Sequence, residues 1–275
     1  MGVMMKIVET GPERIEALRR ERLQRLDRFQ DLYSEFLATG LLGPIKVYNV
    51  ETEGRIAGYA IVSENDILYE FFVIPEYGFQ SDELFNLVLN ELNLMGAMVQ
   101  TFDAAILNPV LRLGWPYRVV GCLYRDFAAV PAVPLDGSLT VRVAGPEDLP
   151  LLSMQDDEVF DPRERLAREV ESGSVFLFYR GSELAGCGFM TRIHDPFPNV
   201  DLGVWTHPDY RHRGVAKRII AYLRNLSLER GLFPQCGCDV NNLPSRKTLA
   251  GCGFVSRYSL LEFTRPNSGD NSPKQ

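Results

Sequence analysis

Apolar residues follow two spacings along this chain, one typical of helices and one typical of strands. Between residues 12 and 37 they recur every three or four positions, which predicts an amphipathic helix. Further helices are predicted at about 82–94, from residues 146 and 162, at about 215–230 and from residue 244. Short apolar runs predict strands at 46–49, 56–62, 67–74, 98–102, 119–127, 140–143, 175–179, 184–192, 200–205, 235–240 and 255–263. Because helices and strands do not alternate regularly, we predict an α+β fold with a mixed, mostly antiparallel sheet flanked by helices.

The same short patterns occur in both halves of the chain. Residues 54–62 and 182–190 each read as a turn followed by an apolar strand that begins with Ala-Gly. Later, Gly114 and Gly253 each stand directly before an aromatic residue. Because these patterns occur in the same order in each half, the sequence predicts an internal repeat of two related domains.

A proline-containing stretch separates the two halves. Pro131 and Pro134 lack a backbone donor and restrict the residue before them, which disfavours a continuing helix or central strand. We therefore predict a first domain at 1–130, a linker at 131–138 and a second domain at 139–265. The alternative is a long loop inside one domain. Residues 266–275 offer nothing apolar to bury and are predicted to form a disordered tail.

Composition and charge exclude several classes of protein. The 275 residues are 45% hydrophobic and 24% charged, which is the balance of a globular protein and excludes wholesale disorder. The net charge of −7 argues against a nucleic-acid partner, and no apolar run approaches the roughly 20 residues that cross a membrane. Five cysteines do not suggest a disulfide framework, and the start leads into a charged helix pattern without a secretory segment. A cytoplasmic location is therefore expected.

The most specific chemical pattern lies at residues 200–218, which read as a strand, a short loop and a helix. Gly214 permits a tight turn, and the small Ala216 leaves room at the first helical turn. The free amides and the positive dipole end of a helix N-terminus bind phosphate groups. Arg211, Arg213 and Lys217 add positive charge at the same place in an otherwise acidic chain. The sequence therefore predicts a site for a pyrophosphate.

The spacing Arg211-x-x-Gly214-x-Ala216 resembles the pyrophosphate loop of the GNAT superfamily of acyl-CoA-dependent N-acetyltransferases. With the order of elements, the likeness extends over about 139–265 and implies two tandem GNAT-like acyl-CoA N-acyltransferase domains. It also implies acetyl-CoA as co-substrate. The residues that the resemblance assigns to the loop are Arg211, His212, Arg213, Gly214, Val215, Ala216 and Lys217.

A second block at 242–254 is similar to the same family. There an Asn after a strand opens a helix that ends at Gly-Phe, as Asn242 and Gly253-Phe254 do here. The resemblance implies that Asn242 and Ser245 contact the pantetheine or phosphate part of coenzyme A. Both residue types also cap helix N-termini, and the two roles are compatible.

The resemblance further implies that the strand backbone at Val204, Trp205 and Thr206 pairs with pantetheine and faces the thioester. Asp201 lies on the same strand, close to where some family members keep a catalytic Glu, and is the predicted general base. Alternatively, Asp201 is an exposed strand end or the partner of an arginine. His194 and Asp195 are second candidates for the base.

One position departs from the family pattern. Many members carry a Tyr five residues before the Phe of Gly-Phe, where it protonates the leaving thiolate, but this chain has Leu249. Either another group such as Tyr258 acts as the acid, or the thiolate leaves without help.

The corresponding loop of the first half, at 73–83, has no basic residue and no Gly-x-Ala turn. Glu76, Asp82 and Glu83 would repel a pyrophosphate. We predict a degenerate GNAT-like domain that serves packing, dimerisation or the shaping of the substrate site. The alternative is a second acyl-CoA site.

Two further patterns point to no separate site. Cys236-Gly237-Cys238 resembles half of a metal site, but no second close pair follows, so we interpret it as small residues on a buried strand and expect no metal. The acidic run at 156–158 either borders the acceptor site or forms a solvated helix end.

Together these patterns predict an N-acyltransferase that moves acetyl from acetyl-CoA to a primary amine by direct attack in a ternary complex. The acceptor is a small-molecule or protein amine, and a homodimer is compatible with the pattern. The alternative is a non-catalytic CoA-binding or regulatory GNAT-like protein, which Leu249 and the altered first half would suit.

Overall fold

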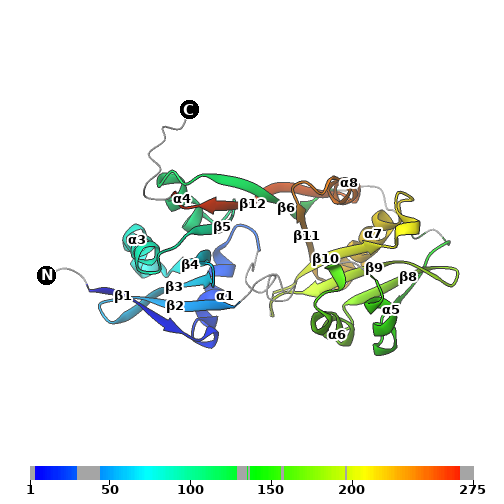
Figure 1. Ribbon diagram of the computed structural model, residues 1–275, viewed down its shortest axis with the longest axis horizontal. Coiled ribbons are helices and arrows are strands. Elements are labelled where there is room, and N and C mark those ends of the chain that lie inside the picture. Colours follow the sequence, from blue (N-terminus) through cyan, green and yellow to red (C-terminus); the bar gives the residue numbers. More distant parts are fainter. Residues whose placement is uncertain are drawn as a thin grey trace. The chain divides into compact units, whose positions relative to one another are not determined.

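The computed structural model describes residues 4–29, 44–128, 135, 137–155, 158–195 and 197–266. These residues form two compact units (Figure 1). Unit 1 contains the described residues up to Val120 and those from Ser259 onward, whereas unit 2 contains the described residues from Gly121 to Tyr258. Most of the expected linker at 131–138 and tail at 266–275 lies outside the described residues, as do positions 30–37 of the first expected helix and 156–157 of the acidic run.

The two units do not divide the sequence at a single point, unlike the expected domains 1–130 and 139–265. The chain passes from unit 1 to unit 2 inside strand β6 (Tyr117–Phe127) and returns inside strand β12 (Phe254–Thr264). Each half of the sequence thus contributes part of a strand to the other unit. The apolar pattern could not reveal this, because alternation along a strand tells which face a residue takes and not which strand lies beside it.

Unit 1 is a mostly antiparallel sheet with helices packed against it. Its elements are β1 (Met5–Thr10), α1 (Glu16–Arg25), β2 (Ile45–Thr52), β3 (Arg55–Ser63), β4 (Ile67–Val73), α3 (Ser81–Glu91), β5 (Gly96–Gln100), α4 (Ala104–Arg112) and the adjoining parts of β6 and β12. The sheet order β1-β2-β3-β4-β5-β12 contains one parallel pair, β4 with β5. Strand β1, which the sequence did not predict, precedes the charged helix α1 and pairs along its whole length, Met5–Thr10, with β2.

Unit 2 repeats this plan. Its elements are β7 (Thr140–Val143), α5 (Leu149–Ser153), α6 (Arg163–Glu171), β8 (Val175–Arg180), β9 (Glu183–Arg192), β10 (Asn199–Thr206), α7 (Val215–Glu229), β11 (Phe233–Asp239), α8 (Leu243–Gly251) and the adjoining parts of β6 and β12. The strands follow the order β12-β6-β11-β10-β9-β8-β7, with β10 and β11 as the parallel pair. Both units therefore have the α+β fold that the sequence predicts.

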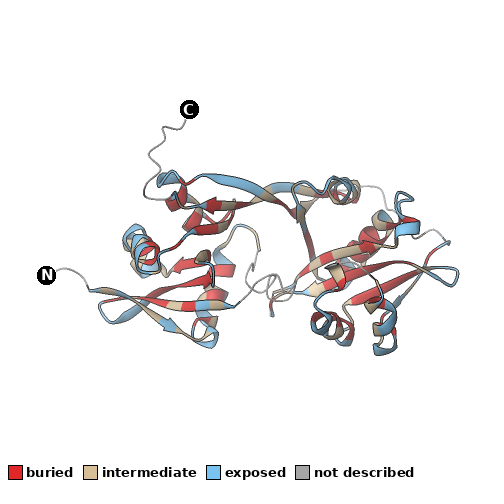
Figure 2. Cartoon of the chain, in the orientation of Figure 1, coloured by how far each residue is buried: buried red, intermediate tan, exposed pale blue. Residues whose placement is uncertain are grey.

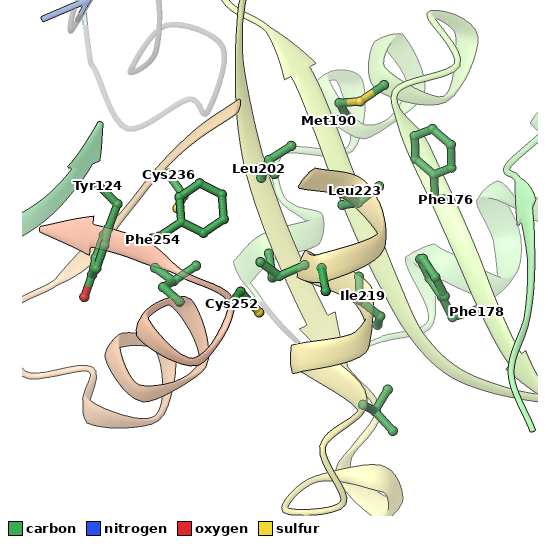
Figure 3. Packing of buried hydrophobic residues seen from close by; sticks show 14 of the residues in the cluster. Tyr124, Phe176, Phe178, Met190, Leu202, Ile219, Leu223, Cys236, Cys252 and Phe254 are labelled. Carbon is green, nitrogen blue, oxygen red and sulfur yellow. The ribbon is translucent and has the colours of Figure 1, made fainter. Parts of the chain in front are cut away.

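Alternate residues of the central strands of unit 2 face two different cores. Phe176 and Phe178 of β8 pack with Ile219 and Leu223 of α7 (Figure 3), whereas Leu177 packs on the side of α5 and α6. Buried residues accordingly follow the strands and the inner sides of the helices (Figure 2). In the described part of the chain, no helix is both long and apolar enough to span a membrane.

The Ala-Gly repeat has a structural cause in both units. A Cβ on Gly58 of β3 would collide with the carbonyl of Phe72 in β4, and one on Gly186 of β9 would collide with the carbonyl of Trp205 in β10. Only glycine allows the two backbones to approach this closely. The matching glycines therefore mark the same strand contact in the two repeats.

A buried network of charged side chains lies beside β4 in unit 1. Arg19 donates to both carboxylate oxygens of Glu70, at 3.2 and 3.3 Å, and the Tyr59 hydroxyl donates to Glu70 at 2.8 Å. Arg22 pairs with Asp103 at 2.5 Å and lies 3.8 Å from Glu70. Burial alone would raise the pKa of Glu70, but Arg22 and Arg19 more than offset this and lower it. Glu70, which is only 1% exposed, is therefore ionised in the core.

Replacing Glu70 with Gln should lower the free energy of unfolding of unit 1 by about 3–5 kcal/mol, because it leaves buried positive charge without its partner. Denaturant titration measures this loss. Asp82→Asn is the matched control, since Asp82 pairs with Arg112 on the surface and should contribute less than about 1 kcal/mol. Equal losses in the two variants would contradict the assignment of Glu70 as a buried ionic centre.

Candidate functional site

The two parallel strands of unit 2 separate early. Strand β10 pairs with β9 from Val200 to Thr206, but with β11 only from Asn199 to Asp201. Beyond Gln235, strand β11 pairs instead with β6. We call the region past Asp201, where β10 and β11 no longer pair, the strand separation.

The backbone of β10 presents polar groups to the strand separation. The amide of His207 donates to the carbonyl of Ala185 at 3.1 Å, so odd-numbered residues of β10 direct their backbone groups toward β9. Val204 and Thr206 therefore direct theirs toward the strand separation, as the sequence analysis expects. Trp205 differs, because its backbone faces β9 and its side chain, 5% exposed, packs against the ring of Phe160 at 5.1 Å.

The loop after β10 enters α7 through two left-handed residues. His212 has φ of 60° and Gly214 has φ of 74°, a region that L side chains rarely adopt and glycine adopts freely. The first amide bonded within the helix is that of Arg218, which donates to the carbonyl of Gly214. The amides of Val215, Ala216 and Lys217 thus lie at the helix entrance without helical acceptors.

Side chains hold this loop while its charges stay exposed. Arg218 donates to the carbonyl of Arg213 at 3.1 Å, and Arg211 donates through Nε to the carbonyl of Thr206 at 3.2 Å. The guanidinium of Arg213 lies 5.8 Å from the ring centre of Tyr210. The loop residues 211–214 are exposed, as is Lys217, whereas Val215 is buried and anchors the start of α7. A fixed loop with free amides and exposed positive charge suits an anion such as a pyrophosphate.

Helix α8 begins with the expected cap. Asn242 accepts through Oδ1 from the amide of Ser245 at 3.0 Å, so the capping role of Asn242 is part of the structure. The other end of α8 packs on the first turn of α7, where the thiol of Cys252 lies 3.3 Å from the carbonyl of Lys217. Asn242 is exposed, which is compatible with a ligand contact in addition to the cap.

A row of polar residues crosses the sheet where the strand separation begins. Thr191 of β9 lies opposite Asp201 of β10, and Asp201 lies beside Gln235 of β11. The pairing of Cys236 with Tyr124 places Arg125 of β6 next to Gln235 in the same row. Glu169 of α6 covers the row and accepts from Thr191 at 3.3 Å.

The surroundings of Asp201 change its acidity. Burial raises the pKa of the Asp201 carboxyl to about 7, Arg125 opposes this shift, and Glu169 adds to it. Burial also raises the pKa of Glu169. A carboxyl whose pKa is raised toward neutrality suits a group that accepts and releases protons.

The remaining sequence candidates lie elsewhere. Tyr258 is on β12, with β6 and β11 between it and β10, so the structure does not bring it together with Asp201. The ring of His194 packs against Phe197, and Asp195 pairs with Arg192 on the surface. Leu249 is 3% exposed and belongs to the core, so this position supplies no acid.

Glu169 and Arg125 are not among the site residues that the sequence predicts. Glu169 lies on a helix with many charged residues, where nothing distinguishes it from its neighbours. Arg125 had a weak signal, since it and Asp126 are two adjacent charged residues in the mostly apolar second half of a strand. Such a residue needs a buried partner, but the sequence does not tell which one.

The cysteines of unit 2 are buried in its core, except Cys238, which is half-buried at the edge of the core. Cys236 and Cys252 are fully buried among apolar side chains (Figure 3). Across the described ranges, no group of three or more His, Cys, Asp or Glu side chains is arranged to hold a metal ion.

The loop of unit 1 that corresponds to the entrance of α7 has a different chemistry. Helix α3 starts at Ser81 with Asp82 and Glu83 in its first turn, and no glycine stands at its cap. Residues 74–83, all described, include neither Lys nor Arg. Unit 1 therefore has the fold without the basic, glycine-containing loop of unit 2.

Comparison with known proteins agrees with this architecture. Residues 12–127 match a family model described as an acetyltransferase (GNAT) domain, and residues 146–254 match the acetyltransferase (GNAT) family. No curated protein sequence matches the chain.

Several solved structures share the fold over nearly the whole chain. An acetyltransferase from the GNAT family of Colwellia psychrerythraea is 19% identical, with a TM-score of 0.78, and the match covers 96% of this chain and 100% of that one. A tandem GNAT protein from the clavulanic acid biosynthesis pathway is 10% identical, with a TM-score of 0.63 and coverage of 96% and 100%. A GCN5-related N-acetyltransferase from Sphaerobacter thermophilus is 15% identical, with a TM-score of 0.57 and coverage of 96% of each chain. With a GNAT match in each half, the chain belongs to the GNAT acetyltransferase family and carries two GNAT domains in tandem.

Proposed function

We propose that this protein transfers an acetyl group from acetyl-CoA to a primary amine, and that unit 2 holds the site. The observation that carries the proposal is the entrance of α7, where the left-handed Gly214 and exposed basic side chains adjoin the strand separation. Unit 1 has no such entrance, so one acyl-CoA site per chain is proposed. The acceptor is a small-molecule or protein amine.

Binding in this proposal relies mainly on backbone groups. The amides of Val215, Ala216 and Lys217 hold the pyrophosphate, with Arg211 and Arg213 neutralising its charge. The backbone of Val204 and Thr206 pairs with the pantetheine arm. Asn242 and Ser245, at the start of α8, contact the same co-substrate.

The chemical step needs a neutral amine beside the thioester carbon. Asp201 in its ionised form accepts the ammonium proton, directly or through a water. The amine nitrogen then attacks the carbonyl carbon, and the tetrahedral adduct loses its second nitrogen proton to solvent. The carbon–sulfur bond breaks, the amide is left, and coenzyme A leaves as the thiolate. With Leu249 in place of an acid, the thiolate takes its proton from solvent. Both substrates are bound together, and no covalent enzyme intermediate forms.

Leu249 also favours a second candidate, a GNAT-like protein that binds acyl-CoA without catalysis. Release of free thiol from acetyl-CoA, measured over a panel of small and peptide amines, separates the two. Amine-dependent release supports the transferase. Binding with no turnover on any amine supports the second candidate.

Charge reversal in the loop tests the binding site. Arg211→Glu combined with Arg213→Glu should weaken acetyl-CoA binding by about a hundredfold, because charge-assisted contacts of roughly 1.5–3 kcal/mol become repulsive. Calorimetry measures the affinity and the stoichiometry.

The matched control for that test is Arg192→Glu with Arg257→Glu, which changes the charge equally at exposed positions outside the loop. It should leave the affinity within about twofold, consistent with screening of distant surface charges. If acetyl-CoA binding were weakened equally in the two variants, or if the loop variant kept full affinity, the assignment of this site would be contradicted.

Substitution of the base should change the pH profile. The wild-type kcat/KM should rise with pH around a midpoint of about 7, as Asp201 loses its proton. Asp201→Asn should lower kcat/KM by about two orders of magnitude and remove that rise. A variant that keeps the wild-type profile would exclude Asp201 as the base.

A stability measurement controls for loss of folding in Asp201→Asn. The pKa of Asp201 is raised from 3.8 to about 7, so ionising it costs folding free energy as the pH rises through this range. The Asn side chain does not ionise, so the variant does not lose this folding free energy. The variant should therefore melt no lower than the wild type at pH 8, even though its activity is reduced.

A further inference from the structure

Arg125 is a buried cation in unit 2 that the proposed chemistry does not yet use. It lies on β6, the strand that starts in unit 1, and is only 3% exposed. One of its guanidinium nitrogens, Nη1, donates to the carbonyl of Cys236 at 2.7 Å and lies 3.4 Å from that of Tyr124. The side chain is thereby tied to β11 beside Gln235, which is the neighbour of Asp201.

The charged and titratable groups around Asp201 come from three elements: α6, β11 and β6. Glu169 on α6 is a second carboxylate, and Arg165 on the same helix lies 3.8 Å from Glu169 and donates to the carbonyl of Val159. Cys236 on β11 is a fully buried thiol. Arg125 on β6 is the cation of the same row, separated from Asp201 only by Gln235 of β11, and its charge opposes the effect of burial on the pKa of Asp201. A lone desolvated carboxylate beside a second carboxylate is costly, and an opposite charge nearby offsets that cost.

We propose that Arg125 is a positioning residue that stabilises the ionised form of Asp201 and fixes the carbonyl of Cys236 where β10 and β11 separate. The catalytic consequence of this inference rests on the proposed function, whereas the NMR test of the inference does not. It gives the N-terminal half of the chain a part in the site of unit 2, since residue 125 precedes the linker that was expected to divide the domains.

Carbon-13 NMR of the full-length protein can follow the Asp201 carboxyl directly, with Asp201→Asn used to assign the signal. Arg125→Gln keeps a donor for the Cys236 carbonyl and removes the charge. It should raise the pKa of Asp201 by about one unit, which is the low end of the effect of a nearby opposite charge. Arg125→Lys should restore most of the wild-type value. Arg257 is exposed on β12, so Arg257→Gln is the matched control and should leave the pKa of Asp201 unchanged.

A second measurement uses the wild type and does not depend on the variant folding. The chemical shifts of the Arg125 side-chain nitrogens should change as Asp201 ionises, and this change should be absent in Asp201→Asn. Two results would overturn the inference. One is a folded Arg125→Gln variant in which the pKa of Asp201 is unchanged, and the other is a set of Arg125 signals that do not change when Asp201 ionises.

Activity then separates this inference from the proposed function. If an amine is acetylated, Arg125→Gln should move the midpoint of the pH–rate profile upward by the same amount and lower the rate at pH 7 roughly fivefold. If no amine is acetylated but the NMR shift is seen, the positioning role stands and the transferase proposal fails. If turnover is normal and neither the midpoint nor the NMR titration moves, the positioning role fails alone.

Discussion

Strands β10 and β11 are hydrogen-bonded to each other over only three residues, and the rest of the candidate site depends on this short pairing. Past Asp201, the backbone groups of Val204 and Thr206 are directed away from β9 with no paired strand beside them. The next residues of the chain turn into the entrance of α7. Backbone groups of β10, a desolvated carboxyl and a helix entrance with exposed basic side chains therefore belong to one unit, although no single sequence motif contains them all.

Unit 1 shows that the fold does not by itself make a site. Its β4 and β5 also separate early, after pairing only at Ile67 and Leu68 with Gly96 and Ala97. Two residues further along β4, Glu70 is bound to Arg19 and Tyr59 inside a charge-balanced network. The same architecture therefore carries an ionic core in one repeat and an exposed basic loop in the other.

The exchange of strands connects the two repeats more closely than a linker would. Part of β12 pairs with β5 in unit 1, and part of β6 pairs with β11 in unit 2. Through β6, the first half of the sequence brings Tyr124 and Arg125 into unit 2. A protein cut at the linker would therefore lose residues from the sheet of each unit.

The sequence by itself determined the repeat, the α+β class and the loop at Arg211–Ala216. These features depend on local requirements: Gly58 and Gly186 permit close strand contact, and Gly214 has a positive φ that other residues resist. Local residue types also predicted the cap formed by Asn242. Asp201, in contrast, was named from the resemblance to the GNAT family. Only the tertiary structure decided which strands are neighbours, and hence that Arg125 and Glu169 surround Asp201 and that Tyr258 lies on a distant strand. The reason is physical: hydrogen bonding within a turn or cap is set by adjacent residues, whereas the charge around a carboxyl is set by side chains that only folding brings near.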